Sequence, residues 1–172
     1  ALLVENPQSP AGQVVQAGGQ LPPHGGSDQL PGLLRPEEVG GRPGVRGLDL
    51  LRPLWEASGG RYGYVSGQLD PRLFTEADEM VTQAREIRAL APNVMIKVPA
   101  STQGVGVVRT LTSEAIPTNT TTCFTLPQIM ASANAAMEGV KLAKERGVDL
   151  SRWRAVITMM IGRLTEHEAL DV

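Results

Sequence analysis

The sequence predicts an α/β fold with a parallel sheet, and more specifically part of a (β/α)8 (TIM) barrel. From residue 62 onwards, apolar runs of strand period alternate evenly with segments of helical period, which indicates repeated strand–helix units. Each of the four clear strands also places at least one polar side chain near its carboxyl end on one common face. A flat doubly wound sheet fits the alternation equally well. However, helices would cover both of its faces, and it would not gather buried polar residues on one of them.

The composition is that of a globular protein. The 172 residues are 41% hydrophobic and 20% charged, which suffices for one domain with a core. A formal net charge of -2 argues against a nucleic-acid or anionic-membrane partner. Cys123 is the only cysteine, so an intrachain disulfide and a cysteine-rich metal site are excluded. No apolar run approaches the roughly 20 residues of a membrane span and no signal-peptide pattern opens the chain, so we expect a cytoplasmic protein.

The first third of the chain lacks this regular pattern. Residues 1–7 predict a short strand that ends at Asn6 and Pro7, whereas residues 8–47 are rich in glycine and proline and show no sustained periodicity. We therefore divide the chain into residues 1–47, an irregular segment or a diverged barrel strand and helix, and residues 48–172, a partial barrel. A complete barrel needs about 250 residues. We expect this chain to hold about half to five-eighths of one, roughly strands 2 or 3 to 6.

The regular elements follow in order from residue 48. A helix is predicted over 48–57 and is stopped by residues 58–60, and a strand is predicted over 62–69 and is stopped by Asp70 and Pro71. Residues 75–78 resemble a capping box and open a helix with apolar residues at helical spacing. Further strands are predicted over 93–100, 116–124 and 154–161, and further helices over 103–114, 126–146 and 165–170. The apolar stripe predicted to face inward on the longest helix is Ile129, Met130, Ala133, Met137 and Val140.

The strand period of 2 assigns the polar side chains to one face. In strand 93–100, Lys97 shares its face with Met95, and the opposite face is purely aliphatic and suited to cover by helices. Because the carboxyl ends of barrel strands form the active site in (β/α)8 enzymes, we expect the polar face to carry one. The corresponding side chains are Tyr64, Ser66, Gln68 and Asp70, then Asn119, Thr121 and Cys123, and finally Val156, Thr158 and Met160.

A lysine on an interior face has a chemical consequence. Burial disfavours the charged amine and lowers its pKa, which makes it a nucleophile able to form a Schiff base with a carbonyl. The alternative is a lysine that snorkels out of the strand end. Taken singly, Thr121 and Thr158 are typical strand threonines, Gln68 and Asn119 suit packing as well as a site, and Arg163 suits a surface position. Together, with the lysine among them, these side chains favour an active site.

Several stretches stand in a characteristic order along the chain. They are residues 51–60, 63–73, 96–100 and 116–121, with a weaker one at 161–164. These stretches resemble the transaldolases and their relatives among the Schiff-base sugar-phosphate aldolases, over about residues 48–165. The order and spacing of several motifs make the resemblance specific. It implies that Lys97 is the Schiff-base lysine, and that Asn119 and Thr121 are the active-site asparagine and threonine of the next strand. Thr158 stands where the family commonly has a serine.

The resemblance also implies substrate contacts and shows departures. Arg163 matches an arginine that binds the sugar phosphate, and Asn6 matches the asparagine of an Asn-Pro pair at the end of the second strand. Gln68, at a catalytic position, stands where transaldolases have glutamate, whereas the related fructose-6-phosphate aldolases have glutamine there. A neutral amide can position the catalytic water but cannot take a proton from it. The family's acid/base aspartate belongs to a first strand that this sequence does not show.

The implied function is transfer of a three-carbon ketol unit between sugar phosphates through a lysine Schiff base, as in the pentose phosphate pathway. Gln68 keeps open an alternative, aldolase-like cleavage without transfer, and a second alternative is a non-catalytic truncated homologue. No metal or organic cofactor is expected. The expected partners are sugar-phosphate substrates, with neither nucleic acid nor membrane. An open half-barrel exposes sheet edges and apolar interior, which favours a homo-oligomer.

Overall fold

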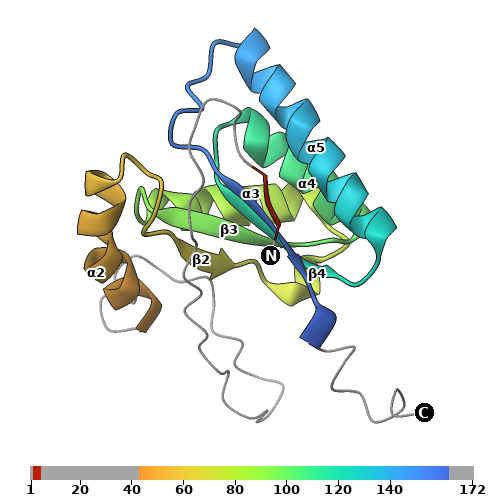
Figure 1. The fold of residues 1–172 in the computed structure, drawn as a ribbon. Helices are drawn as coiled ribbons and strands as arrows, with labels where there is room; N and C mark the ends of the chain where they lie inside the picture. Colours follow the sequence, from red (N-terminus) through yellow and green to blue (C-terminus); the bar gives the residue numbers. More distant parts are fainter. Residues whose placement is uncertain (1, 5–42, 163–172) are drawn as a thin grey trace, which may run out of the picture.

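A computed structural model describes residues 2–4 and 43–162, in which strands and helices alternate (Figure 1). Asn6, Arg163 and the helix predicted over 165–170 lie outside the described residues. The strands are β1 (Leu2–Val4), β2 (Val65–Gln68), β3 (Val94–Pro99), β4 (Thr118–Cys123) and β5 (Ala155–Met159). The helices are α2 (Pro43–Ala57), α3 (Ala77–Ala89), α4 (Thr102–Ser113) and α5 (Leu126–Glu145), with a 3-10 turn, η1, at Pro71–Leu73.

The strands form one sheet in the order β1-β5-β4-β3-β2, and the four strands from β2 to β5 are parallel neighbours. Each of β3, β4 and β5 is reached through a helix, α3, α4 and α5 respectively, and these helices pack on one face of the sheet (Figure 1). This is the arrangement of part of a (β/α)8 barrel, so the predicted fold class is confirmed. The helix-covered face is the outer face, and the opposite face is the inner face.

The short strand predicted near the amino terminus is present as β1, but it does not lie where a barrel strand before β2 would. β1 pairs antiparallel with β5, with Leu3 opposite Val156, at the edge of the sheet farthest from β2. A preceding barrel strand would instead be a parallel neighbour of β2. β1 therefore covers the edge of β5.

Helix starts differ from the prediction at two places. α2 begins at Pro43 rather than at residue 48, since proline at the first helical position has a suitable φ and lacks an N–H that would go unpaired. The capping box predicted over 75–78 is wrong, because the N-cap of α3 is Glu76 and its side chain makes no capping bond. A complete capping box occurs at α5 instead, between Thr125 and Gln128.

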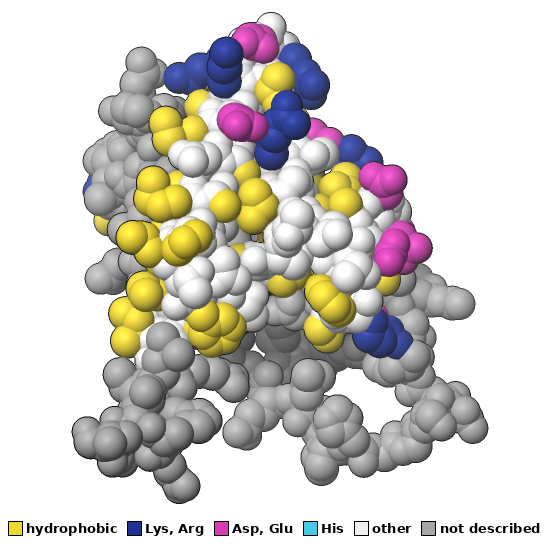
Figure 2. Space-filling model, turned by 90° about the vertical axis from the view of Figure 1, so that its right-hand side faces the viewer, with side chains coloured by type: hydrophobic (Ala, Val, Ile, Leu, Met, Phe, Trp, Pro, Cys, Tyr) yellow, Lys and Arg dark blue, Asp and Glu magenta, His cyan; other side chains and the backbone are white. Residues whose placement is uncertain are grey.

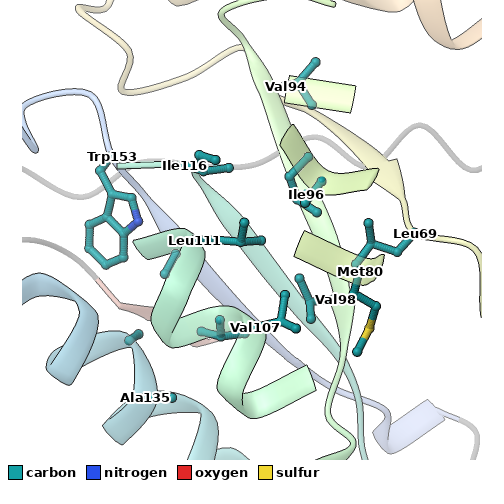
Figure 3. Packing of buried hydrophobic residues seen from close by; sticks show 14 of the residues in the cluster. Leu69, Met80, Val94, Ile96, Val98, Val107, Leu111, Ile116, Ala135 and Trp153 are labelled. Atoms are coloured by element: carbon teal, nitrogen blue, oxygen red, sulfur yellow. The ribbon is translucent and has the colours of Figure 1, made fainter. Parts of the chain in front are cut away.

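The core lies between the sheet and the outer helices. Ile96 and Val98 of β3 are completely buried with Leu111 of α4, as the aliphatic face of the strand predicted. Figure 3 shows part of this cluster, with Val98 of β3 beside Val107 of α4. The alternation of inward and outward side chains is thereby fixed for β3, which leaves Lys97 on the inner face.

The predicted inward stripe of α5 is partly confirmed. Ile129, Ala133 and Val140 pack against the core, but the two methionines do not. Met130 and Met137 are 51% and 65% exposed, whereas the fully buried positions carry small side chains. A Cβ on Gly139 would lie 2.5 Å from Thr112 Cβ of α4, so close approach of the two helices selects small residues there. Figure 2, seen from the side of α5, shows hydrophobic side chains spread over this surface. The buried residues of α5 are Ser132, Ala135, Ala136, Gly139 and Ala143.

None of the described helices is long and apolar enough to cross a membrane.

Candidate active site

The inner face of the sheet has an apolar half and a polar half. Towards the amino ends of the strands, Tyr64, Met95 and Val156 form a buried cluster with Trp55 of α2. The Tyr64 hydroxyl donates a hydrogen bond to the backbone oxygen of Arg152, and burial raises the pKa of the Tyr64 phenol. The cluster closes the amino end of the sheet. Polar side chains gather towards the carboxyl ends, where (β/α)8 enzymes hold their active sites.

Three predicted site residues lie side by side on neighbouring strands. Gln68 of β2 is the register partner of Lys97 of β3, and Lys97 is the partner of Asn119 of β4. Side chains at paired positions of neighbouring strands point to the same face, so all three belong to the inner face. The strand period predicts these three residues on one face, and the register of the sheet agrees.

Hydrogen bonds tie the polar half together across three strands. Asn119 is completely buried, and its Oδ1 accepts a hydrogen bond of 3.0 Å from Thr158 Oγ1 of β5. Its Nδ2 donates one of 3.4 Å to Ser66 Oγ of β2. Asn119 therefore has a partner on each side. The strand period predicts Ser66 on this face, and the structure shows it in direct contact with Asn119, a candidate site residue.

Lys97 is less enclosed than the sequence predicts. Its side chain is half-buried, and its ammonium group makes no hydrogen bond or ion pair with any described residue. Gln68 beside it is exposed, and its Nε2 donates to the backbone oxygen of Leu69 at 2.9 Å. The sequence predicts a lysine on an interior face, and the structure leaves the Lys97 side chain only partly buried near the carboxyl end of β3.

Thr121 and Cys123 do not share a face, contrary to the prediction. Thr121 is 5% exposed and its Oγ1 donates to Met160 Sδ at 3.9 Å, whereas Cys123 packs on the other side with Ile129 of α5. Between them, Thr122 has a φ of 59°, and the pairing with β5 shifts register between Thr120 and Cys123. One residue in the left-handed region breaks the alternation of a strand. Burial also raises the pKa of the Cys123 thiol.

Asp70 follows β2 closely in the chain, and its carboxylate is hydrogen-bonded to Arg72. Asp70 accepts bonds from Arg72 Nε at 2.9 and 3.0 Å and from the Arg72 backbone N–H at 2.9 Å. The hydrogen bond from the Arg72 guanidinium holds the pKa of Asp70 below its usual value. Asp70 thereby caps η1 rather than serving the lysine. The side chains gathered around Lys97 are therefore amides and hydroxyls.

Other features of the described residues lie away from this site. No group of three or more histidine, cysteine, aspartate or glutamate side chains within the described ranges could hold a metal ion. A shallow groove of about 340 Å³ runs between α3 and α4 and is lined by Val81, Arg85 and Thr110 among others. Because both helices cover the outer face, this groove lies across the sheet from Lys97. The polar half of the inner face is the better candidate site.

Comparison with known proteins finds similar sequences for the part of the chain that forms this sheet. A family model described as Transaldolase/Fructose-6-phosphate aldolase matches residues 42–169. A curated protein called Transaldolase from Mycobacterium ulcerans is 36% identical over 118 residues, which are 67% of this chain and 32% of that protein. One from Thiobacillus denitrificans is 37% identical over 125 residues, 71% of this chain and 35% of that protein. The matched part spans about a third of the length of these curated relatives.

Proposed function

The chain belongs to the transaldolase/fructose-6-phosphate aldolase family, and on that premise we propose that it carries the Schiff-base strand of a transaldolase-like enzyme. The enzyme would transfer a three-carbon ketol unit between sugar phosphates. The position of Lys97 carries the proposal. It lies in register with Asn119 and Gln68, among uncharged polar side chains at the carboxyl ends of parallel strands. Lysine in such a setting is suited to imine chemistry.

The proposed reaction begins with the neutral amine of Lys97. Nζ attacks the keto carbon of a ketose phosphate, and the carbinolamine loses water to give an imine. The hydroxyl beside the C–C bond gives its proton to water as the bond breaks, and the protonated imine accepts the electron pair, which releases an aldose phosphate and leaves an enamine. The enamine carbon attacks the aldehyde of an acceptor aldose phosphate, and hydrolysis of the new imine frees the lysine. This sequence needs no metal or organic cofactor.

The remaining site residues would orient the reacting groups. Asn119, Thr121 and Thr158 would hold the substrate hydroxyls and the water, and the bond from Thr158 to Asn119 supports this arrangement. Gln68 would position the water without taking its proton. For the residues outside the described ranges, the family resemblance alone suggests Arg163 for the sugar phosphate and Asn6 for a further substrate contact. A guanidinium suits the phosphate because its planar fork donates two parallel bonds.

Borohydride trapping of the imine tests the proposal. The chain has three lysines, Lys97, Lys141 and Lys144, so peptide mass mapping assigns an adduct without ambiguity. Incubation with fructose 6-phosphate and borohydride should add one reduced sugar to Lys97. Lys97→Arg should abolish the adduct, and the double variant Lys141→Arg/Lys144→Arg on α5 should retain it. Absence of an adduct on Lys97 in the wild-type chain would contradict the proposal.

A second candidate is cleavage without transfer, which Gln68 favours because fructose-6-phosphate aldolases resemble this chain at that position. The two reactions differ in their need for an acceptor. An aldolase releases glyceraldehyde 3-phosphate from fructose 6-phosphate alone, whereas a transaldolase turns over only when an acceptor aldose phosphate is supplied. Measuring release with and without the acceptor separates them.

Two further expectations stay as proposals, namely a cytoplasmic location and self-association of the open barrel. Sedimentation velocity tests the second, since a monomer that unfolds cooperatively would argue against it.

A further inference from the structure

Ser66 holds an unusual position relative to the lysine strand. It belongs to β2, while its hydrogen-bond partner Asn119 belongs to β4, so the 3.4 Å bond passes over the inner face of β3. In the register, Ser66 lies opposite Met95, whereas Asn119 lies opposite Lys97. The bond therefore runs obliquely across β3, on the amino-terminal side of the lysine.

The Asn119 amide depends on such partners for its orientation. The terminal torsion of asparagine has broad minima, so hydrogen bonds rather than rotamer preference set the plane of the amide. Thr158 supplies a donor for Oδ1, and Ser66 supplies the acceptor that Nδ2 has among the described residues. Because Asn119 is completely buried, bulk water is a poor replacement for either partner.

The Ser66 hydroxyl can also make further hydrogen bonds besides the one from Asn119. Its Oγ accepts from Asn119, and its O–H has no acceptor among the described residues. A hydroxyl has one donor and two acceptor sites, so it can hold the amide and still bond to water or to a substrate hydroxyl. The Ser66 side chain is half-buried, so part of it remains exposed.

We propose that Ser66 is a positioning residue, which fixes the Asn119 amide beside Lys97 and thereby speeds imine formation. The chemical half of this inference rests on the proposed Schiff-base function, whereas the orientation of the amide does not. An amide held by both partners keeps one orientation at the register position beside Lys97. A misoriented amide would cost rate more than binding, since it acts on the groups that react.

Two variants and a matched control test the proposal in the complete chain. Ser66→Ala removes the hydroxyl, and Ser66→Thr keeps it with a side chain that suits a strand. Ser113→Ala is the control, because Ser113 is a buried serine on α4 whose hydroxyl donates to Thr110 at 2.7 Å, away from Lys97. All three are compared with the wild type under conditions where circular dichroism shows them folded.

The first readout is the side-chain amide of Asn119 in the NMR spectrum of isotope-labelled protein, assigned by its loss in Asn119→Asp. Ser66→Ala should shift this pair of resonances and speed its exchange with solvent by about tenfold, the worth of one buried hydrogen bond. Ser66→Thr and Ser113→Ala should leave both unchanged. Unchanged resonances in Ser66→Ala would overturn the proposal, whether or not the chain reacts with a sugar.

The second readout is the rate of borohydride-trapped adduct on Lys97 at several concentrations of fructose 6-phosphate. Ser66→Ala should lower the maximal trapping rate by about tenfold with little change in the half-saturating concentration of fructose 6-phosphate. Ser66→Thr should trap at the wild-type rate. A shifted amide with an unchanged trapping rate would overturn the chemical role. If the wild-type chain forms no adduct, the proposed function fails, and the amide measurement alone decides whether Ser66 positions Asn119.

Discussion

Thr158 and Asn119 are joined by a hydrogen bond of 3.0 Å between Oγ1 and Oδ1, although 39 residues separate them in the sequence. The bond links β5 to β4 on the inner face, one strand away from Lys97. Because Asn119 is completely buried, losing this donor would leave its side-chain oxygen without a hydrogen bond and destabilise the fold. The same hydrogen bond therefore belongs to the candidate site and stabilises the sheet.

Thr158→Val should be destabilising although it keeps the shape of the side chain. Removing the hydroxyl leaves the buried Asn119 oxygen without its donor, at a cost of about 1–3 kcal/mol in the free energy of unfolding. Urea denaturation followed by circular dichroism measures this loss. Thr158→Ser retains the donor and should stay closer to the wild type. Equal stability of the valine variant and the wild type would show that another donor reaches Asn119.

Gly139 and Gly106 should respond to alanine in opposite directions. A Cβ on Gly139 would lie 2.5 Å from Thr112 Cβ and 2.6 Å from the Arg109 backbone oxygen, so Gly139→Ala should cost about 1–3 kcal/mol through overpacking of α5 on α4. A Cβ on Gly106 meets open space, and Gly106→Ala should stabilise α4 by about 0.5–1 kcal/mol. Thermal unfolding of the two variants compares them directly. A loss in Gly106→Ala would mean that the exposed side of α4 is covered in solution.

The ends of α4 and α5 allow a matched exchange of glycine and alanine. Both helices end in a Schellman motif, with bonds from Ile116 to Leu111 and from Val148 to Ala143. The left-handed residue is Ala115 at a φ of 57° in one and Gly147 at 69° in the other. Ala115→Gly should therefore stabilise the fold, and Gly147→Ala should destabilise it, each by about 1 kcal/mol. Differential scanning calorimetry should show opposite shifts of Tm, and shifts of the same sign would contradict the assignment.

Tyr64 should make the fold sensitive to alkaline pH. Burial raises the pKa of its phenol above the ordinary value, so the unfolded chain loses this proton first as pH rises. The free energy of unfolding should then fall from about pH 10 upwards, because the unfolded state binds fewer protons. Tyr64→Phe should remove this fall, although it is less stable near neutral pH without the bond to Arg152.

The control for this prediction is Tyr62→Phe, since the chain has only two tyrosines and Tyr62 is half-buried at the surface. It should keep the alkaline loss of stability. Phenolate absorbance of the folded Tyr62→Phe variant reports Tyr64 alone. Ionisation of that tyrosine at its ordinary pKa would contradict the structural account.

The sequence predicted the parallel strands and their helices because period 2 and period 3.6 are properties of the backbone. The same rule placed Gln68, Lys97 and Asn119 on one face, and the register confirms it. It failed at Cys123, where one left-handed residue, Thr122, reverses the alternation. A β-branched residue rarely adopts that φ. Here Thr122 Oγ1 holds the turn by donating to the Thr121 oxygen at 2.6 Å and accepting from Ala100 N–H at 3.2 Å, contacts that no local pattern reveals.

Packing partners explain the other differences. Hydrophobicity alone selected Met130 and Met137 as inward residues of α5, but the distance between α4 and α5 admits only small side chains at the contact. The role of Ser66 also depends on a residue two strands away in the sheet. Long-range geometry of this kind is set by the sheet and is not encoded in the spacing within one strand.

The hydrogen-bonded chain from Ser66 through Asn119 to Thr158 has a consequence for synthesis on the ribosome. Its two bonds span 53 and 39 residues, so neither forms within a single strand–helix unit. Since Thr158 emerges last, the nascent chain presents Lys97 on an unfinished sheet until β5 has been made. Domains fold as units during synthesis, so these side chains come together as the sheet closes. Both hydrogen bonds of Asn119 are therefore complete only once β5 has docked on β4.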